Sequence, residues 1–569
     1  MTKRTVDGEV GFGGWRVAAL AAAGLGMWGC GDDSTSGPDG GDADVADGGD
    51  GEAADAACPV DVPGGHGIAV TEFGAVQGAD SEGGGLEFLG VPYARPPVGE
   101  LRWRAPQDPD CWEGARPAIE WGEACLQRSY DITASPPTME DLGSEDCLSL
   151  NVWTPDIDDA ARPVLVFIHG GGNQQGSARD EAMGALMYEG RFLSQTEDVV
   201  VVSIQYRLGL FGFLADPSLE DADGHAGNYG LLDQTHALRW VRRNIEAFGG
   251  DPERVLVFGQ SAGGLDVCML VASPLAAGLF DAALIQSGGC IVLTEAEAQA
   301  RSEEWATAVG CADAAGRATC LRALDGAALL GPIESPELDG ITNLKFIPYV
   351  DGWVLPSAPV ESFRAGTHNH VPVIIGTNSD EVSLMVPEGS VTPAEVTAFF
   401  ERFADPLPAR LAELYPPGTT PESARAAYIQ ALGDGQFTCQ ARMISRALVE
   451  GQTEPVRRYY FTHRVPGDLG ASLGAFHGIE NFYLFRTAES TLLAVLLTDD
   501  DRLVEDALGG WWTRFAATGD PNGTGGPSWP VYETATDPYL EIAPEAVTGA
   551  GLHTEACDLW EPISEIPTE

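Results

Sequence analysis

Runs of consecutive apolar residues, each ending in a turn, mark out the strands expected of this chain. Residues 163–168 and 255–258 are unbroken apolar runs rich in β-branched side chains, and residues 372–375 form a shorter one. An unbroken run is typical of a strand buried on both faces, whereas a strand with one solvent-exposed face alternates apolar and polar residues. Residues 457–462 form a further strand-like segment. We therefore expect these four segments to be strands of the core.

Helices are expected on either side of the strand at 255–258. Residues 229–248 place six apolar side chains near helical spacing, as a helix packed against a core does. Residues 265–272 are also compatible with a helix. The strand therefore lies between two helical segments.

A Gly-x-Ser-x-Gly pattern joins this strand to the second helix. It comprises Gly259, Gln260, Ser261, Ala262 and Gly263. In a nucleophile elbow a serine on a sharp strand-to-helix turn is raised to the edge of the sheet, and the two glycines let the backbones pass. A glycine-rich chain can produce the pattern by chance in a loop, but here the required strand and helix flank it. Ser261 is the predicted nucleophile.

The strand at 163–168 ends in a His-Gly-Gly-Gly turn at residues 169–172, which suits an oxyanion hole. Residues without side chains let successive backbone N–H groups point toward the spot where an attacked ester carbonyl becomes negative. The N–H group of Ala262, directly after the serine, would join them. Because glycine turns end many strands, this turn alone is weak evidence for an oxyanion hole. Its occurrence together with the elbow makes the interpretation strong.

A serine nucleophile on such an elbow needs an acid and a histidine, which follow it in that order in loops after later strands. The segment after residues 372–375 reads Gly-Thr-Asn-Ser-Asp-Glu and ends in two adjacent carboxylates, Asp380 and Glu381. The spacing does not choose between them. The other carboxylate would then be an ordinary turn or helix-capping residue.

Three of the nine histidines lie beyond that segment. His477 stands in a glycine-flanked loop after residues 457–462. His463 lies at the end of that strand, and His553 is near the C-terminus, where we expect a surface position. His477 is the preferred base, with the other two as alternatives.

Together these segments resemble the type-B carboxylesterase family, which includes the cholinesterases and bile-salt lipases and has the α/β-hydrolase fold. The resemblance extends over roughly residues 65–562 and rests on further motifs that are specific in combination. These motifs are Gly-Val-Pro-Tyr-Ala at 90–94, Leu-Arg-Trp-Arg-Ala-Pro at 101–106, Ser-Glu-Asp-Cys-Leu-Ser-Leu-Asn-Val at 144–152, Asn-Tyr-Gly-Leu-Leu-Asp-Gln at 228–234, Phe-Gly-Gly-Asp-Pro at 248–252 and Phe-Ala-Ala-Thr-Gly-Asp-Pro-Asn at 515–522.

The resemblance implies a large, mostly parallel sheet flanked by helices, with cap or gorge segments inserted between strands. In the family pattern a glutamate closes the Asn-x-Asp-Glu segment and the histidine precedes a glycine, which selects Glu381 and His477 as partners of Ser261. The implied oxyanion donors are Gly171, Gly172 and Ala262.

The implied chemistry is hydrolysis of neutral carboxylic esters through an acyl-enzyme intermediate. We expect no cofactor and no metal, because the sequence has no Cys/His cluster at zinc spacing and no phosphate-binding glycine loop.

Departures from the family pattern limit the range of substrates that we expect. Residue 260 is Gln where many relatives have Glu. Between Cys125 and Cys147 the chain lacks the tryptophan with which cholinesterases hold a quaternary ammonium by cation–π attraction, so a cholinesterase is not expected. Residues 382–385 include Val, Leu and Met where cholinesterases have aromatic residues. These aliphatic side chains could line a pocket for acyl chains or simply pack in the hydrophobic core.

The N-terminus predicts export. Basic residues precede an apolar run at 17–29, which is too short to span a bilayer and suits a secretory signal. Gly29 before Cys30 resembles the cleavage box of bacterial lipoproteins. Residues 1–29 are therefore the expected signal peptide and Cys30 the expected site of lipid attachment, with plain secretion as the alternative.

Residues 30–57 are rich in Gly, Ala and Asp and contain no basic residue, so we expect a disordered, self-repelling spacer. Residues 58–569 contain no second linker, repeat or run of like charge. Because site residues as distant as Gly171 and His477 must converge, a single α/β domain with insertions explains this region better than two domains do.

Export permits disulfides, and ten of the 11 cysteines remain once Cys30 is set aside. The family resemblance suggests the pairs Cys125–Cys147, Cys311–Cys320 and Cys439–Cys557. We further predict Cys58–Cys111 and Cys268–Cys290, the second because the helix after the elbow and the end of the next strand can approach each other. Free buried thiols are the alternative for these last four.

The net charge is −53, with 85 acidic against 32 basic residues. This excess argues against nucleic acid and against direct binding to anionic lipid surfaces. The expected partner is a small ester. If the protein is a cell-envelope lipoprotein, we expect it to contact the membrane only through its lipid anchor. If it is instead secreted or periplasmic, we expect no membrane contact. The alternative to an enzyme is a catalytically silent, surface-anchored adhesion or binding module of the same fold. An intact Ser261, Glu381 and His477 favours the enzyme.

Overall fold

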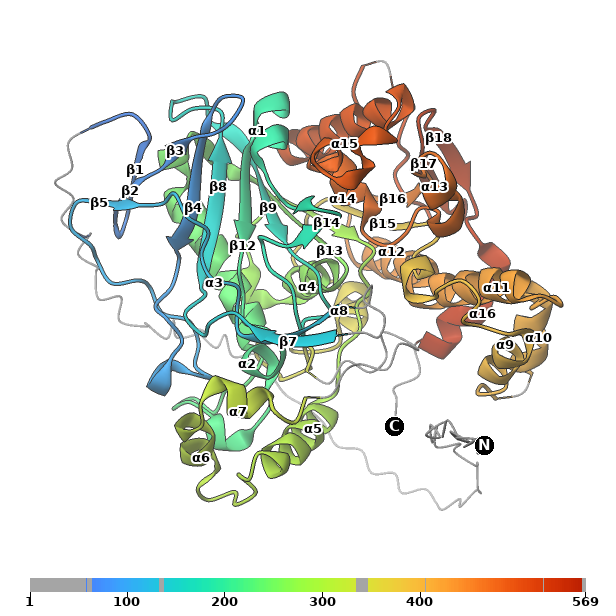
Figure 1. The fold of residues 1–569 in the computed structure, drawn as a ribbon, viewed down its shortest axis with the longest axis horizontal. Coiled ribbons are helices and arrows are strands. Elements are labelled where there is room, and N and C mark those ends of the chain that lie inside the picture. Colours follow the sequence, from blue (N-terminus) through green and yellow to red (C-terminus); the bar gives the residue numbers. More distant parts are fainter. Residues whose placement is uncertain are drawn as a thin grey trace, which may run out of the picture.

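The computed structural model describes residue 58 and residues 64–131, 138–333, 346–404, 406–524 and 526–564. An eleven-stranded sheet forms the centre, in the order β18-β17-β16-β15-β14-β13-β9-β12-β8-β4-β3 (Figure 1). The strands from β17 to β12 in this order run parallel, and antiparallel pairs extend the sheet at both edges. The strands are Ala79–Asp80 (β3), Leu86–Pro92 (β4), Ser149–Thr154 (β8), Arg162–Ile168 (β9), Val200–Ile204 (β12), Gly250–Gln260 (β13), Ala282–Gln286 (β14), Val373–Asn378 (β15), Val456–Phe461 (β16), Pro538–Ile542 (β17) and Val547–Ala550 (β18).

Both faces of the parallel strands are covered, which explains their unbroken apolar sequences. In β9, Val164, Val166 and Ile168 enter one core, and the alternate residues Leu165 and Phe167 enter the other. Helices that pack against the first core include α3 (Tyr229–Asn244), α4 (Ala262–Ala272), α8 (Pro359–Ala365) and α12 (Cys439–Gly451). Helices that pack against the second include α1 (Arg191–Glu197), α14 (Ile479–Leu484) and α15 (Asp499–Thr518).

Two groups of helices are inserted between strands of the sheet. Between β14 and β15 the chain forms α5 (Glu295–Ala308), α6 (Arg317–Ala323) and α7 (Gly326–Leu330), at the bottom of Figure 1. Between β15 and β16 it forms α9 (Pro393–Phe400), α10 (Leu407–Leu414) and α11 (Pro421–Gly433), which meet the C-terminal α16 (Thr554–Ser564) at the right of the view. This second group has its own small core, which includes Val396, Leu411 and Trp560. The predicted insertions are therefore present.

The remaining α-helices and strands are short. The helices are α2 (Gly209–Phe213) and α13 (Asp468–Leu473). A three-stranded sheet consists of β1 (Ile68–Thr71), β2 (Gly74–Gln77) and β5 (Ala115–Pro117). Two two-stranded sheets consist of β6 (Gln127–Asp131) with β7 (Thr138–Leu142), and of β10 (Glu181–Ala182) with β11 (Ala185–Leu186).

Two predicted segments have a conformation other than the one expected. The segment predicted as a loop from residue 376 begins as strand, because β15 continues to Asn378, which pairs with Phe461 of β16. The helix predicted for 229–248 is α-helical only to Asn244 and tightens into a 3₁₀ turn at Ile245–Phe248, which ends at Gly249 in a left-handed conformation with φ of 79°. The four predicted strands otherwise lie in β9, β13, β15 and β16.

Five disulfides link the described residues. The structure joins Cys58 to Cys111, Cys125 to Cys147, Cys268 to Cys290, Cys311 to Cys320 and Cys439 to Cys557, the same pairs that were expected from the sequence. In the part of the chain that the structure describes, no helix is both long and apolar enough to cross a membrane. The predicted signal peptide, Cys30 and the spacer lie outside the described residues.

Candidate active site

Ser261 occupies a strained turn between β13 and α4. Its φ of 60° and ψ of −122° lie far from the preferred regions for a residue with a side chain. The flanking glycines are required by close backbone contacts: a Cβ on Gly259 would collide with the backbone of Gly263, and a Cβ on Gly263 would collide with the carbonyl of Ile168 in β9. The elbow predicted from the sequence is therefore formed, and it holds the serine at the carboxyl end of its strand.

The glycine turn after β9 lies directly beside this serine. A Cβ placed on Gly170 would come within 3.0 Å of the Ser261 Cβ. Gly171 and Gly172 have φ of 108° and 67°, which side chains rarely allow. Ala262 is the first residue of α4, where a backbone N–H has no acceptor within the helix. The three candidate oxyanion donors are thus brought to the same edge of the sheet.

Buried hydrogen bonds tie the glycine turn to the helix that follows the serine. The Tyr206 hydroxyl donates to the His169 carbonyl at 2.9 Å, and the Asn173 amide donates to Asp266 Oδ1 of α4 at 2.8 Å. Gln234 Nε2 donates to the other oxygen of Asp266 at 2.6 Å. Burial raises the pKa of Asp266 to about 7 despite these two donors.

Of the two adjacent carboxylates, Glu381 reaches the histidine. Glu381 Oε2 lies 2.6 Å from His477 Nδ1, and Glu381 Oε1 accepts the backbone N–H of Asn378 at 2.7 Å. Asp380 points elsewhere and accepts the N–H of Ala475 at 3.0 Å, two residues before the histidine. Of the two carboxylates that the spacing left open, Glu381 is the one that contacts the imidazole, and Asp380 braces the histidine loop.

The two nitrogens of the His477 ring have different surroundings. Its Nδ1 faces Glu381, while its Nε2 is buried and has no hydrogen-bond partner among the described residues. Burial alone would lower the pKa of His477, but the charge and hydrogen bond of Glu381, with a smaller contribution from Glu480, raise it above the ordinary value of 6.5. The Phe437 ring lies 5.1 Å from the imidazole, between ring centres.

The two alternative histidines belong to other contacts. His463 Nε2 lies 2.8 Å from Asp501 Oδ1 of α15. His553 was expected at the surface, but it is half-buried, because its Nδ1 lies 2.5 Å from Asp434 Oδ1. The hydrogen bonds of these two rings are therefore with Asp501 and Asp434 rather than with Glu381.

A cavity of about 670 Å³ adjoins the glycine turn. It is lined by Gly171 and by residues of the same loop, Gln175, Gly176 and Ser177. Its apolar lining residues include Trp121, Leu142, Leu186 and Met187. Ligands of open α/β sheets bind beyond the carboxyl ends of the strands, which is where this cavity lies relative to β9.

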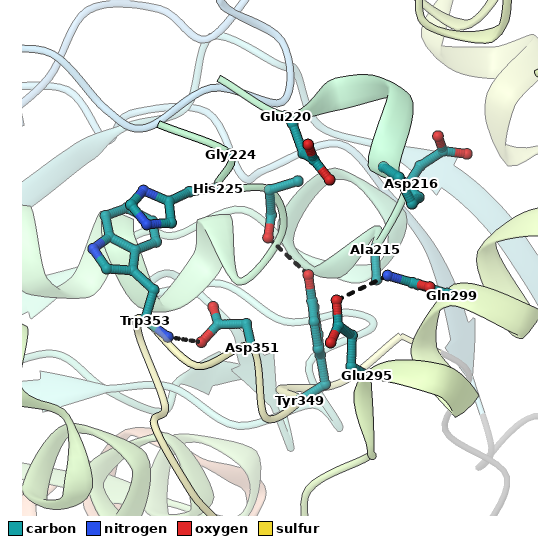
Figure 2. Close-up of a pocket in the computed structure, with 12 residues that line it drawn as sticks. Ala215, Asp216, Glu220, Gly224, His225, Glu295, Gln299, Tyr349, Asp351 and Trp353 are labelled. Atoms are coloured by element: carbon teal, nitrogen blue, oxygen red, sulfur yellow. Dashed lines mark hydrogen bonds between the residues drawn. The ribbon is translucent and has the colours of Figure 1, made fainter. Parts of the chain in front are cut away.

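A second pocket, of about 40 Å³, is too small for an ester substrate and shares no lining residue with this cavity (Figure 2). In it the rings of His225 and Trp353 stack at 4.1 Å between centres. Two of its carboxylates are engaged by the protein, the buried Asp216 by Arg317 and the partly exposed Asp351 by Asn228. Ser261, Glu381 and His477 do not line it.

Comparison with known proteins decides the family. The model of the carboxylesterase family matches residues 66–560. The chain belongs to the carboxylesterase family. The para-nitrobenzyl esterase of Bacillus subtilis (strain 168) is 34% identical over 489 residues, which cover 84% of this chain and 95% of that protein. The cocaine esterase of Homo sapiens is 32% identical over 522 residues, which cover 85% of this chain and 88% of that protein.

Comparison with solved structures supports the same family. One of a PNB esterase has a TM-score of 0.74 to this carboxylesterase at 32% sequence identity, covering 87% of this chain and 100% of the other. The predicted family, the predicted enzyme class and the predicted α/β-hydrolase fold are confirmed.

Sequence reasoning missed several residues that support the site of this carboxylesterase. Glu480, three residues after His477, is wholly buried, accepts from Asn378 Nδ2 at 2.6 Å and has a pKa raised to about 7 by burial and by the charge of Glu381. Asn173 and Asp266 were also missed. Spacing gives no signal for such residues, because their partners come from distant segments.

Proposed function

We propose that this carboxylesterase hydrolyses neutral carboxylic esters with Ser261 as nucleophile, His477 as base and Glu381 as the acid that orients the imidazole. The observation that carries the proposal is the 2.6 Å contact between His477 Nδ1 and Glu381 Oε2, which leaves the opposite ring nitrogen buried and free of partners among the described residues. The strained elbow and the adjacent glycine turn support it further.

The first step transfers the acyl group to the enzyme. The Ser261 oxygen attacks the ester carbonyl carbon while His477 Nε2 takes the hydroxyl proton. The backbone N–H groups of Gly171, Gly172 and Ala262 stabilise the negative oxygen of the tetrahedral intermediate. When the intermediate collapses, the alkoxide leaves with the proton from His477, and the acyl group remains on Ser261.

In the second step water takes the place of the serine hydroxyl as the attacking group. His477 takes a proton from water, whose oxygen attacks the acyl carbon, and the new intermediate releases the carboxylic acid and returns the proton to Ser261. In both steps Glu381 orients the ring of His477 and stabilises the imidazolium.

The test of the proposed activity is hydrolysis of p-nitrophenyl esters from acetate to palmitate by the purified protein. We expect release of nitrophenolate with an optimum at one acyl length, which separates esterase from lipase behaviour. Folded protein that releases none across the whole series would contradict the proposal and favour the silent binding module.

The pH dependence of kcat/KM should report the raised pKa of His477. Protonated His477 cannot accept the serine proton, so the rate should fall about tenfold per pH unit on the acid side. Because the pKa of His477 lies above 6.5, the midpoint of this fall should also lie above pH 6.5. Removing the charge in Glu381→Gln should move the midpoint to lower pH. A midpoint below 6.5 in the wild type, or no movement in the variant, would contradict the assignment of Glu381.

We also propose that the enzyme is exported. Five disulfides suit an oxidising compartment, because the cytosol keeps most thiols reduced. Lipid attachment at Cys30 remains a prediction from the sequence.

A further inference from the structure

The candidate oxyanion donors belong to two separate pieces of the chain. Gly171 and Gly172 lie in the turn after β9, whereas Ala262 is the first residue of α4. Such donors stabilise a negative oxygen only when they are held at about 3 Å from it, so the turn and the helix must keep one fixed spacing. Glycines have no side chains with which to pack. The position of the turn therefore has to be fixed by neighbouring residues.

A buried carboxylate on α4 links the two pieces. Asp266 lies one helical turn after Ala262 and has no exposed surface. Its Oδ1 accepts from Nδ2 of Asn173, which directly follows Gly172, at 2.8 Å. Among the described residues this is the one side-chain hydrogen bond between α4 and the glycine turn at residues 169–173.

Both partners of this hydrogen bond are held in place by further contacts. Gln234 Nε2 of α3 donates to Asp266 Oδ2 at 2.6 Å, which prevents rotation of the carboxylate. The Tyr206 hydroxyl, which donates to the carbonyl of His169, also lies 3.1 Å from Asn173 Oδ1. This hydroxyl thereby connects the residues on both sides of the three glycines. A shift of Asp266 would be passed to the turn through Asn173.

An acid is a costly residue at this place in the core. Burial raises the pKa of Asp266 to about 7, and no cation is among the groups that act on it. A neutral or apolar side chain would cost less to bury, so stability does not explain the carboxylate. Buried acids of this kind gather at functional sites. A carboxylate oxygen also accepts an amide hydrogen bond more strongly than a neutral oxygen does, which suits a residue that must hold a mobile turn.

We infer that Asp266 is a positioning residue for the oxyanion hole: through Asn173 it holds the glycine turn and the start of α4 at the spacing that the tetrahedral intermediate requires. The inference rests on the proposed ester hydrolysis and adds a residue to it. Asp266 takes no proton in the reaction. Its loss should therefore weaken binding of the transition state and leave binding of the ester itself nearly unchanged.

The test is a double-mutant cycle with Asp266→Ala and Asn173→Gly. Glycine removes the amide of residue 173 and keeps its φ of 58° without strain. One measurement is kcat and KM for a p-nitrophenyl ester. The other is the Ki of an alkyl trifluoromethyl ketone, to which Ser261 adds to form a tetrahedral oxyanion. Each kcat is divided by the number of serines that react with a fluorophosphonate, so that unfolded chains do not count.

In each single variant we expect kcat to fall about tenfold and the Ki of the ketone to rise by a similar factor, with KM changed less than about twofold. The double variant should be no slower than the slower single variant, because both residues act through one hydrogen bond. Asp266→Asn should restore most of kcat. Its oxygen can still accept from Asn173, and Gln234 Oε1, which has no partner among the described residues, can turn to accept from the new amide.

The matched control is Asp216→Asn, which removes another buried carboxylate, one that pairs with Arg317 at 3.1 Å. This variant should lower the temperature of unfolding but change kcat per reactive serine and the Ki of the ketone by less than about twofold. It separates the general cost of disturbing a buried acid from an effect on the oxyanion.

The inference would be overturned if Asp266→Ala or Asn173→Gly kept the wild-type kcat and Ki, or if kcat fell while Ki did not change. Losses that multiply in the double variant would overturn it as well. Asn173→Gly carries the prediction even if Asp266→Ala does not fold. Wild-type protein that neither hydrolyses p-nitrophenyl esters nor reacts with the fluorophosphonate would instead refute the proposed function.

Discussion

Replacing Ser261 with alanine is expected to abolish ester hydrolysis, with kcat falling on the order of a millionfold. The hydroxyl oxygen of Ser261 is the atom that bonds to the acyl carbon, and alanine has none. The strained backbone at φ of 60° already carries a Cβ, so alanine adds no steric conflict and the variant should fold. Initial rates with the best p-nitrophenyl ester, together with thermal unfolding of both proteins, measure the two effects.

A matched control is available in Ser287. This serine is also buried, has a φ of 48° and follows β14 at the same edge of the sheet. Ser287→Ala should retain hydrolysis. If Ser261→Ala kept more than about a hundredth of the wild-type kcat, the nucleophile would have to be another residue.

Replacing His477 with alanine should cost as much as replacing the serine, because base and nucleophile act as one unit and their losses do not add. The double variant Ser261→Ala with His477→Ala should therefore be no slower than either single variant. The measurement is kcat for the three variants with the same ester.

His463→Ala is the control for the loss of a buried imidazole that contacts a carboxylate, here Asp501. It should affect stability more than kcat. Near-normal hydrolysis by His477→Ala, or a loss in His463→Ala as large as in His477→Ala, would contradict the choice of base.

The elbow and the glycine turn could be predicted from the sequence because each depends on close backbone contact at a defined place. Gly259 and Gly263 are required since their backbones touch, and that requirement is visible as a spacing. The buried strands were predictable for a similar reason: with helices on both faces, neither side of β9 needs polar residues.

The choice between Asp380 and Glu381 could not be made from spacing, although the family resemblance made it. Adjacent side chains leave the backbone in different directions, and here one reaches the N–H of Ala475 and the other the imidazole of His477. Only the path of the loop from β16 to His477 decides which carboxylate meets the ring.

Buried carboxylates were the least predictable part of the site. Asp266 and Glu480 look like ordinary acidic residues in a chain with 85 of them. Burial by segments distant in sequence raises their pKa values, and in Asp266 it does so although Asn173 and Gln234 donate hydrogen bonds that act to lower the pKa. Composition and motif therefore gave no signal for them.

The most direct test of Ser261 as the nucleophile is to trap it in a covalent adduct. A fluorophosphonate reacts with an activated serine and leaves a stable adduct whose position mass spectrometry of peptides can assign. We expect one adduct per chain, on the peptide that contains Ser261, and none in Ser261→Ala. An adduct on another serine, or none in a protein that still hydrolyses esters, would contradict the assignment of Ser261.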